Sequence, residues 1–149
     1  MIQYTNGRFR IADRLSLKLP DNVFLDFNPP VVPVEGFVCY SPDLKTTIDV
    51  NLVENAQDAR TFLLEALEDS ESVCTLREPQ RVSTGSLEGY SMAYASENYS
   101  YEEYVFAVPG TEPALFDVCF TRRSAELPDA EIYAKLRDEL LAGIEAHQQ

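Results

Sequence analysis

Few residues of this chain have the type and spacing that catalysis requires. The only histidine, His147, lies in the polar tail 146–149, which we expect to fray. A triad built on a histidine base is therefore close to excluded. The segment 85–89 contains two glycines but lacks the following lysine and helix of a phosphate-binding loop. We expect no phosphate site there.

The cysteines do not have the spacing of a metal site. Cys39, Cys74 and Cys119 are odd in number and lack CxxC spacing, which argues against a zinc knuckle or a disulfide framework. We interpret them as buried free thiols in a reducing cytoplasm. Cys119, with Arg122 and Arg123 nearby, comes closest to the electropositive setting of a nucleophile, although core packing is favoured.

Acidic residues offer a weak alternative. Glu65, Glu68, Asp69 and Glu71 could bind a hard cation, but a calcium-type spacing is absent and a solvated helix end has the same composition. We expect no metal, no cofactor and no enzymatic activity.

The residues that most favour binding lie in one predicted hairpin. Tyr99 and Tyr101 are interleaved there with Glu97, Glu102 and Glu103. Tyrosine combines rigid contact area with a polar tip and is enriched at interfaces. We therefore predict a partner-binding surface from these five residues. The alternative is that the neighbouring tyrosines are cross-strand or core partners.

The elements that position this hairpin form a predicted meander. The run 87–122 shows three stretches of alternating side chains, with turns at 96–100 and at Pro109-Gly110. In the first stretch, bulky Tyr90, Met92 and Tyr94 alternate with small residues. This pattern suits a strand with a helix close against its small side, or a strand whose second face meets a partner. The run 87–122 is therefore predicted to form three consecutive antiparallel strands.

The remaining strands are predicted from turn signals. Asn6-Gly7 predicts a hairpin between 2–4 and 8–11. Further strands are expected at 15–19, 23–27, 36–40, 46–53, 73–76 and 80–83, and the proline-rich stretch 28–33 is expected to be a loop or an edge crossing.

Two amphipathic helices complete the prediction. Asn55, with Asp58 in the first turn, can cap a helix whose stripe runs from Ala59 to Leu67. Leu127-Pro128-Asp129 opens a last helix, with an apolar stripe at Ile132, Tyr133, Leu136, Leu140 and Ile144. The expected fold is a single α+β domain over residues 1–149, an antiparallel β-sheet with amphipathic helices packed on it.

Charge narrows the classes of partner. Twelve basic residues against 25 acidic ones leave a net charge of −13, which opposes attraction to nucleic acid or to an anionic membrane. It favours a basic protein partner. An apolar run of membrane-spanning length and a signal sequence are both absent, so we expect a cytoplasmic protein.

A family resemblance rests on the order of the elements and on a few local stretches. These are Phe9-Arg10-Ile11, the segment 15–24 with its strand, proline, turn and aromatic residue, Gly89-Tyr90, and the closing helix. With them the whole chain resembles the Mog1/PsbP-like family, including bacterial DUF1795 and DcrB-type domains. The family's aromatic residue after the turn is often Trp, whereas this chain has Phe24. The resemblance implies binding or assembly factors rather than enzymes, and transfers no catalytic residues.

The function expected from the sequence is a non-enzymatic interaction or accessory module that binds a basic protein partner through the acidic tyrosine hairpin. The alternative is a small-molecule or peptide-binding domain, with a pocket between the sheet and residues 28–34. Self-assembly into a homo-oligomer through a sheet edge is also left open.

Overall fold

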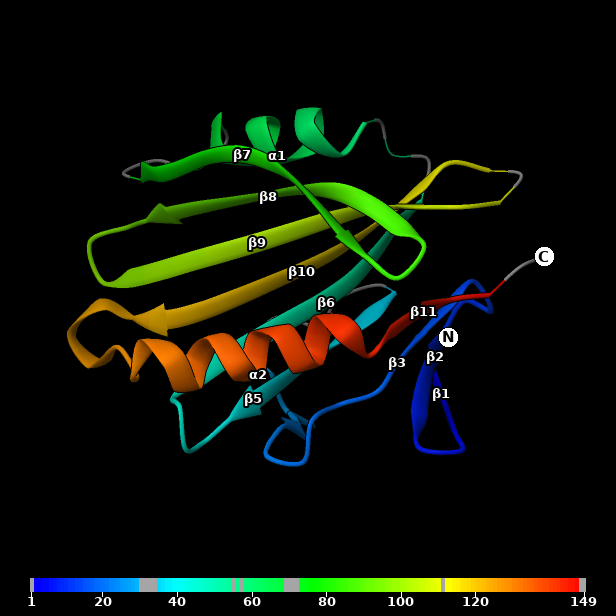
Figure 1. Ribbon diagram of the computed structural model, residues 1–149, viewed down its shortest axis with the longest axis horizontal. Helices are drawn as coiled ribbons and strands as arrows, with labels where there is room; N and C mark the ends of the chain where they lie inside the picture. The colour runs from blue at the N-terminus through cyan, green and yellow to red at the C-terminus, as the bar shows by residue number, and fades with distance from the viewer. Residues whose placement is uncertain are drawn as a thin grey trace.

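The computed structural model describes residues 2–29, 35–54, 56, 58–68, 73–110 and 112–147. Within these ranges the chain forms a mixed α+β structure of two antiparallel sheets, two α-helices and a short 3₁₀ helix, η1 (Ser124–Glu126) (Figure 1). The predicted α+β class and antiparallel pairing are confirmed at this level. Neither helix of the described part is long and apolar enough to cross a membrane.

The larger sheet has seven strands in the order β4-β5-β6-β10-β9-β8-β7. Their bounds are β4 (Phe24–Leu25), β5 (Gly36–Ser41), β6 (Thr46–Glu54), β7 (Cys74–Thr84), β8 (Leu87–Ala95), β9 (Tyr99–Val108) and β10 (Ala114–Arg123). The predicted meander is confirmed as β8, β9 and β10. The predicted strand pair β5 and β6 lies in the same sheet, because β6 pairs with β10.

The smaller sheet joins the two ends of the described chain. It has the order β1-β2-β3-β11, formed by β1 (Ile2–Thr5), β2 (Arg8–Ile11), β3 (Leu15–Leu17) and β11 (Ile144–Ala146). The predicted hairpin is confirmed, with positive φ at both Asn6 and Gly7 as a type I′ turn requires. The expected fraying of the tail 146–149 is wrong for Ala146, because it pairs with Leu15 where β11 lies beside β3.

β7 is one long edge strand rather than the two short strands expected. Pro79 lacks an amide donor, but the pairing with β8 shifts register between Thr75 and Arg77 and again between Arg77 and Gln80. These irregularities let the strand continue past the proline.

Both predicted helices are present. α1 (Ala59–Glu68) begins after Asp58, whose carboxylate accepts a hydrogen bond from the backbone N–H of Thr61. α2 (Ala130–Ala142) begins after Asp129, whose carboxylate accepts from the backbone N–H groups of the second and third following residues. Asp58 therefore caps the first turn of α1, and the predicted cap Asn55 lies outside the described residues.

The large sheet buries a cluster of side chains on each face. On the face toward α2, here called the α2 face, Phe106, Phe116 and Phe120 pack with Tyr133, Leu136 and Leu140. On the opposite α1 face, Met92, Val105 and Leu115 pack with Ala59 and Leu63. Ile132 is an exception to the predicted helix stripe, because it is 56% exposed.

A glycine sets how closely β8 approaches β9. A Cβ atom added at Gly89 would overlap the backbone oxygen of Val105. Glycine is therefore required in this strand for steric reasons, independently of its φ angle.

Candidate functional site

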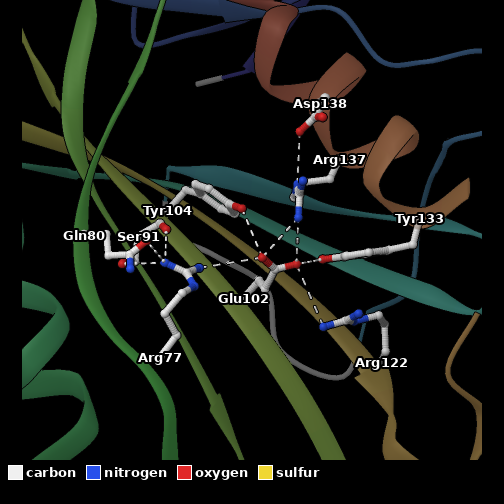
Figure 2. Close-up of polar contacts among 9 residues, drawn as sticks. All are labelled: Arg77, Gln80, Ser91, Glu102, Tyr104, Arg122, Tyr133, Arg137 and Asp138. Carbon is white, nitrogen blue, oxygen red and sulfur yellow. Dashed lines mark hydrogen bonds and ion pairs between the residues drawn. The ribbon is translucent and has the colours of Figure 1, made fainter. Parts of the chain in front are cut away.

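Glu102 of β9 is the centre of a polar network on the α2 face (Figure 2). Its carboxylate accepts hydrogen bonds from the hydroxyls of Tyr133 at 2.6 Å and Tyr104 at 3.1 Å. The guanidinium of Arg137 lies 3.3 Å from Oε2, and those of Arg77 and Arg122 lie within 4 Å of the carboxylate. Only 12% of the Glu102 side chain is exposed. Glu102 is therefore an internal ion-pair partner.

The small face of β8 makes room for one of these arginines. Arg77 crosses from the edge strand, and its guanidinium donates to the hydroxyl of Ser91 at 2.9 Å on the way to Glu102. The small residues on this face of β8 leave room for Arg77, whereas α2 packs on the neighbouring strands.

Tyr133 connects the network to the helix. Its ring lies 4.0 Å from the guanidinium carbon of Arg122 and meets the ring of Phe120 edge to face. Burial, together with Glu102, raises the pKa of Tyr104 to about 12 and raises that of Tyr133 as well. Both tyrosines are hydrogen-bond donors at neutral pH, and the network fastens α2 to β9.

Glu103 points to the other face of the sheet. There it accepts a hydrogen bond of 2.8 Å from the Tyr94 hydroxyl. Cys119 of β10 is paired in register with both Glu103 and Asp49 of β6, and Asp117 lies two residues along β10 on the same face. We call Asp49, Glu103 and Asp117 the acidic cluster.

Two carboxyl groups of the acidic cluster have pKa values above the ordinary range of aspartate. Desolvation, followed by the nearby Glu103 carboxylate, raises the pKa of Asp117 well above its ordinary value. The same two causes raise the pKa of Asp49. The buried Oδ1 atoms of Asp117 and of Asn51, which faces it across the strands, have no hydrogen-bond partner within the part of the chain described. Within the described residues, the cluster and Asn51 therefore contain two buried oxygen atoms whose hydrogen-bonding capacity is unused.

The predicted hairpin residues are divided by the strand alternation. Tyr99, Tyr101 and Glu103 share the α1 face, and the Tyr101 ring stacks on Tyr94 at 4.9 Å between centroids. Tyr99 is 37% exposed, and Glu97 is exposed in the turn before β9. Glu102 is separated from the other four because it faces α2. The predicted set therefore does not form one continuous acidic surface.

The cysteines differ in their surroundings. Cys39 is buried and Cys119 is partly buried, and desolvation raises the pKa of both. The expectation of a buried thiol is wrong for Cys74, which is exposed at the start of β7. Among the described residues, no group of three His, Cys, Asp or Glu side chains could hold a metal ion. Asp69 and Glu71 lie outside the described residues.

A groove of aromatic side chains lies where the two sheets meet. It has a volume of about 780 Å³ and is lined by the β1–β2 hairpin, the β3–β4 connection and β5. Its aromatic residues are Tyr4, Phe9, Phe24, Phe27 and Tyr40. Phe27 lies directly before the proline-rich stretch, of which 30–34 are outside the described residues.

Comparisons with known proteins give information on the fold. No protein-family model matches this chain, and no curated protein does. One similar solved structure is LpqN of Mycobacterium tuberculosis, described as involved in cell envelope biogenesis, with a TM-score of 0.63 and 11% identity over 89% of this chain and 82% of LpqN. Another is a protein of Bacteroides thetaiotaomicron, with a TM-score of 0.52 and 18% identity over 91% of this chain. This chain spans 46% of that protein.

At these identities the likeness shows a shared fold alone.

Sequence reasoning missed two features of the site. The burial of Glu102 had a signal, because Glu102 shares its parity with the bulky Tyr104 and Phe106. The sequence signal for the groove was weaker, because its aromatic residues come from turns and short strands that are distant in the sequence.

Proposed function

We propose that this chain is a non-enzymatic interaction module that binds a basic segment of a protein partner at the acidic cluster. The observation that carries the proposal is the placement of Asp49, Glu103 and Asp117 on one sheet face. In the described part of the chain, none of the three forms an ion pair with a lysine or arginine. Three neighbouring carboxyl groups without a cation favour an arriving one.

The geometry favours a long side chain. Asp49 is exposed at the rim of the cluster, whereas Glu103 is only 5% exposed. A lysine or arginine could reach from the rim toward Glu103 and pass the stacked rings of Tyr94 and Tyr101. Tyr99 would then contact the partner at the end of the strand.

Proton release gives a specific test of this site. A bound cation stabilises the ionised carboxylates, so Asp117 should lose its proton when a basic peptide binds. We would titrate an arginine-rich octapeptide by calorimetry in two buffers of different ionisation enthalpy. The expected result is net proton release and an affinity that rises between pH 5 and pH 8.

Matched variants separate this site from general attraction to an acidic protein. Asp49→Asn should weaken binding, and Asp117→Asn should remove most of the proton release. Glu131→Gln on the exposed side of α2 should change neither. Equal losses in all three variants would show only long-range charge attraction. A fourth variant, Glu97→Gln, tests the turn before β9. If peptide binding were weakened in this variant alone, the binding site would lie at that turn.

The fold family and the cellular location of the protein are part of the same proposal. We propose a Mog1/PsbP-like domain, supported by the order of strands and helices and by the similarity in fold to LpqN. A cytoplasmic location stays a prediction, and the involvement of LpqN in cell envelope biogenesis makes the cell envelope the competing location. Fractionation of native cells decides between them, and light scattering tests for a homo-oligomer.

A further inference from the structure

The aromatic groove contains four exposed aromatic side chains in the part of the chain that the structure describes. Tyr4, Phe24, Phe27 and Tyr40 are 65%, 51%, 91% and 40% exposed, and all four line the same groove. Exposed aromatic side chains gathered in one concave place usually mark a binding site. This feature is independent of the acidic cluster.

The arrangement of the rings offers aromatic faces from both sheets. Tyr4 lies 4.8 Å from Phe9 in the β1–β2 hairpin, and Phe24 lies 6.2 Å from Tyr40 across β4 and β5. Figure 1 shows this hairpin and the β3–β4 connection at the lower side of the molecule, away from α1. The groove thus has an aromatic pair on each side.

The charge of the residues that line the groove favours a cationic ligand. Among the described residues that line the groove, Asp21 is the only charged one. Aromatic faces carry partial negative charge and attract cations, and a nearby carboxylate adds to this attraction. The net charge of −13 further favours an approaching cation over an anion.

We propose that the groove binds a free small organic cation, a quaternary ammonium carried on an apolar or aromatic body. The ammonium group would lie against the rings beside Asp21, and the apolar body would fill the remaining volume. The groove's 780 Å³ lies within the range of small-molecule sites.

A pair of isosteric probes tests the charge. Benzyltrimethylammonium and its neutral carbon isostere, neopentylbenzene, have nearly the same shape, and binding of each would be followed by shifts of the protein's amide NMR signals. We expect the cation to bind more tightly, with shifts centred on residues of the groove. Equal or tighter binding of the neutral compound, or binding of neither, would overturn the proposal.

Conservative variants test the position. Phe27→Leu keeps an apolar side chain but removes the aromatic face, and Asp21→Asn removes the charge. Each should weaken binding of the cation by about threefold, the size of an exposed cation–π contact. Both positions are exposed, so neither variant should disturb the fold.

Ile132→Ala is the control, because Ile132 is an exposed apolar residue of α2 that lies outside the groove and outside the acidic cluster. It should leave the affinity for the cation unchanged. A loss in a further variant, Tyr99→Leu, with none in Phe27→Leu would assign the cation to the acidic cluster and overturn the groove proposal. Preference for phosphatidylcholine vesicles over the free probe would overturn the assignment to a free small molecule.

Discussion

At the scale of single residues, Glu102 shows how a carboxylate can serve the fold rather than a partner. It compensates the charges of Arg77, Arg122 and Arg137, which reach it from β7, β10 and α2 (Figure 2). A partly buried arginine without a carboxylate partner is costly because little water reaches it.

Glu102→Gln should therefore lower the free energy of unfolding by about 3 kcal/mol, as expected when one partner of a buried ion pair is removed. Urea denaturation at pH 7 measures this. Glu97→Gln, an exposed change in the adjacent turn, should have an effect within about 0.5 kcal/mol. Equal effects of the two variants would contradict the internal role of Glu102.

Asp117 gives a residue-level prediction for pH. Its pKa is raised above 3.8 in the folded state, so folding retains a proton that the unfolded chain releases. The stability that Asp117 contributes is complete below about pH 4 and is lost as pH rises through its raised folded pKa.

Asp117→Asn should remove this loss, because the amide does not ionise. We expect the variant to be more stable than the parent at pH 8 and to have a smaller decline in melting temperature between pH 5 and pH 8. Parallel curves for the two proteins would show that Asp117 does not carry the proton.

At the scale of elements, β8 illustrates what the sequence could and could not predict. Its alternation of bulky and small residues predicted a strand with a helix against its small side or a partner on its second face. The strand is present, but α1 packs on its bulky side, against Met92. The residue that fills the small face, Arg77, comes from a strand that was expected to be two pieces. Only the paired register brings it over Ser91.

Gly85, in the turn between β7 and β8, and Gly89, within β8, should respond differently to alanine. Gly89→Ala should destabilise the protein by several kcal/mol, about 3 or more, because the new Cβ would overlap a backbone atom of β9 that cannot move aside. Gly85→Ala should cost about 1 to 2 kcal/mol, because its positive φ is unfavourable but the space around it is open. Chemical denaturation of both variants compares them, and a larger cost at Gly85 would contradict the close approach at Gly89.

At the scale of the whole molecule, the pairing of β3 with β11 in the smaller sheet could not be predicted from the sequence. Ile144 fits the spacing of the α2 stripe and was assigned to that helix. In the structure the helix ends before Gly143, and Ile144 pairs with Leu17 in β11. Local periodicity could not show this, because a three-residue strand carries too little pattern and its partner lies near the other end of the chain.

Two isoleucines test this assignment. Ile144→Ala should lower the free energy of unfolding by about 3 kcal/mol, because Ile144 is 5% exposed in the core. Ile132→Ala should change it by less than about 1 kcal/mol, because that side chain is largely exposed on α2. Thermal or urea unfolding distinguishes them, and a reversed order would return Ile144 to a helical stripe.

The pairing of β3 with β11 also has a consequence for synthesis on the ribosome. The strands of the large sheet all lie between residues 24 and 123 and can pair once that stretch has left the exit tunnel. β3 must wait for β11, which is translated after every other strand described, so one edge of β3 stays unpaired throughout that interval. Nascent chains stalled just before Gly143 should therefore be the species most in need of chaperone protection.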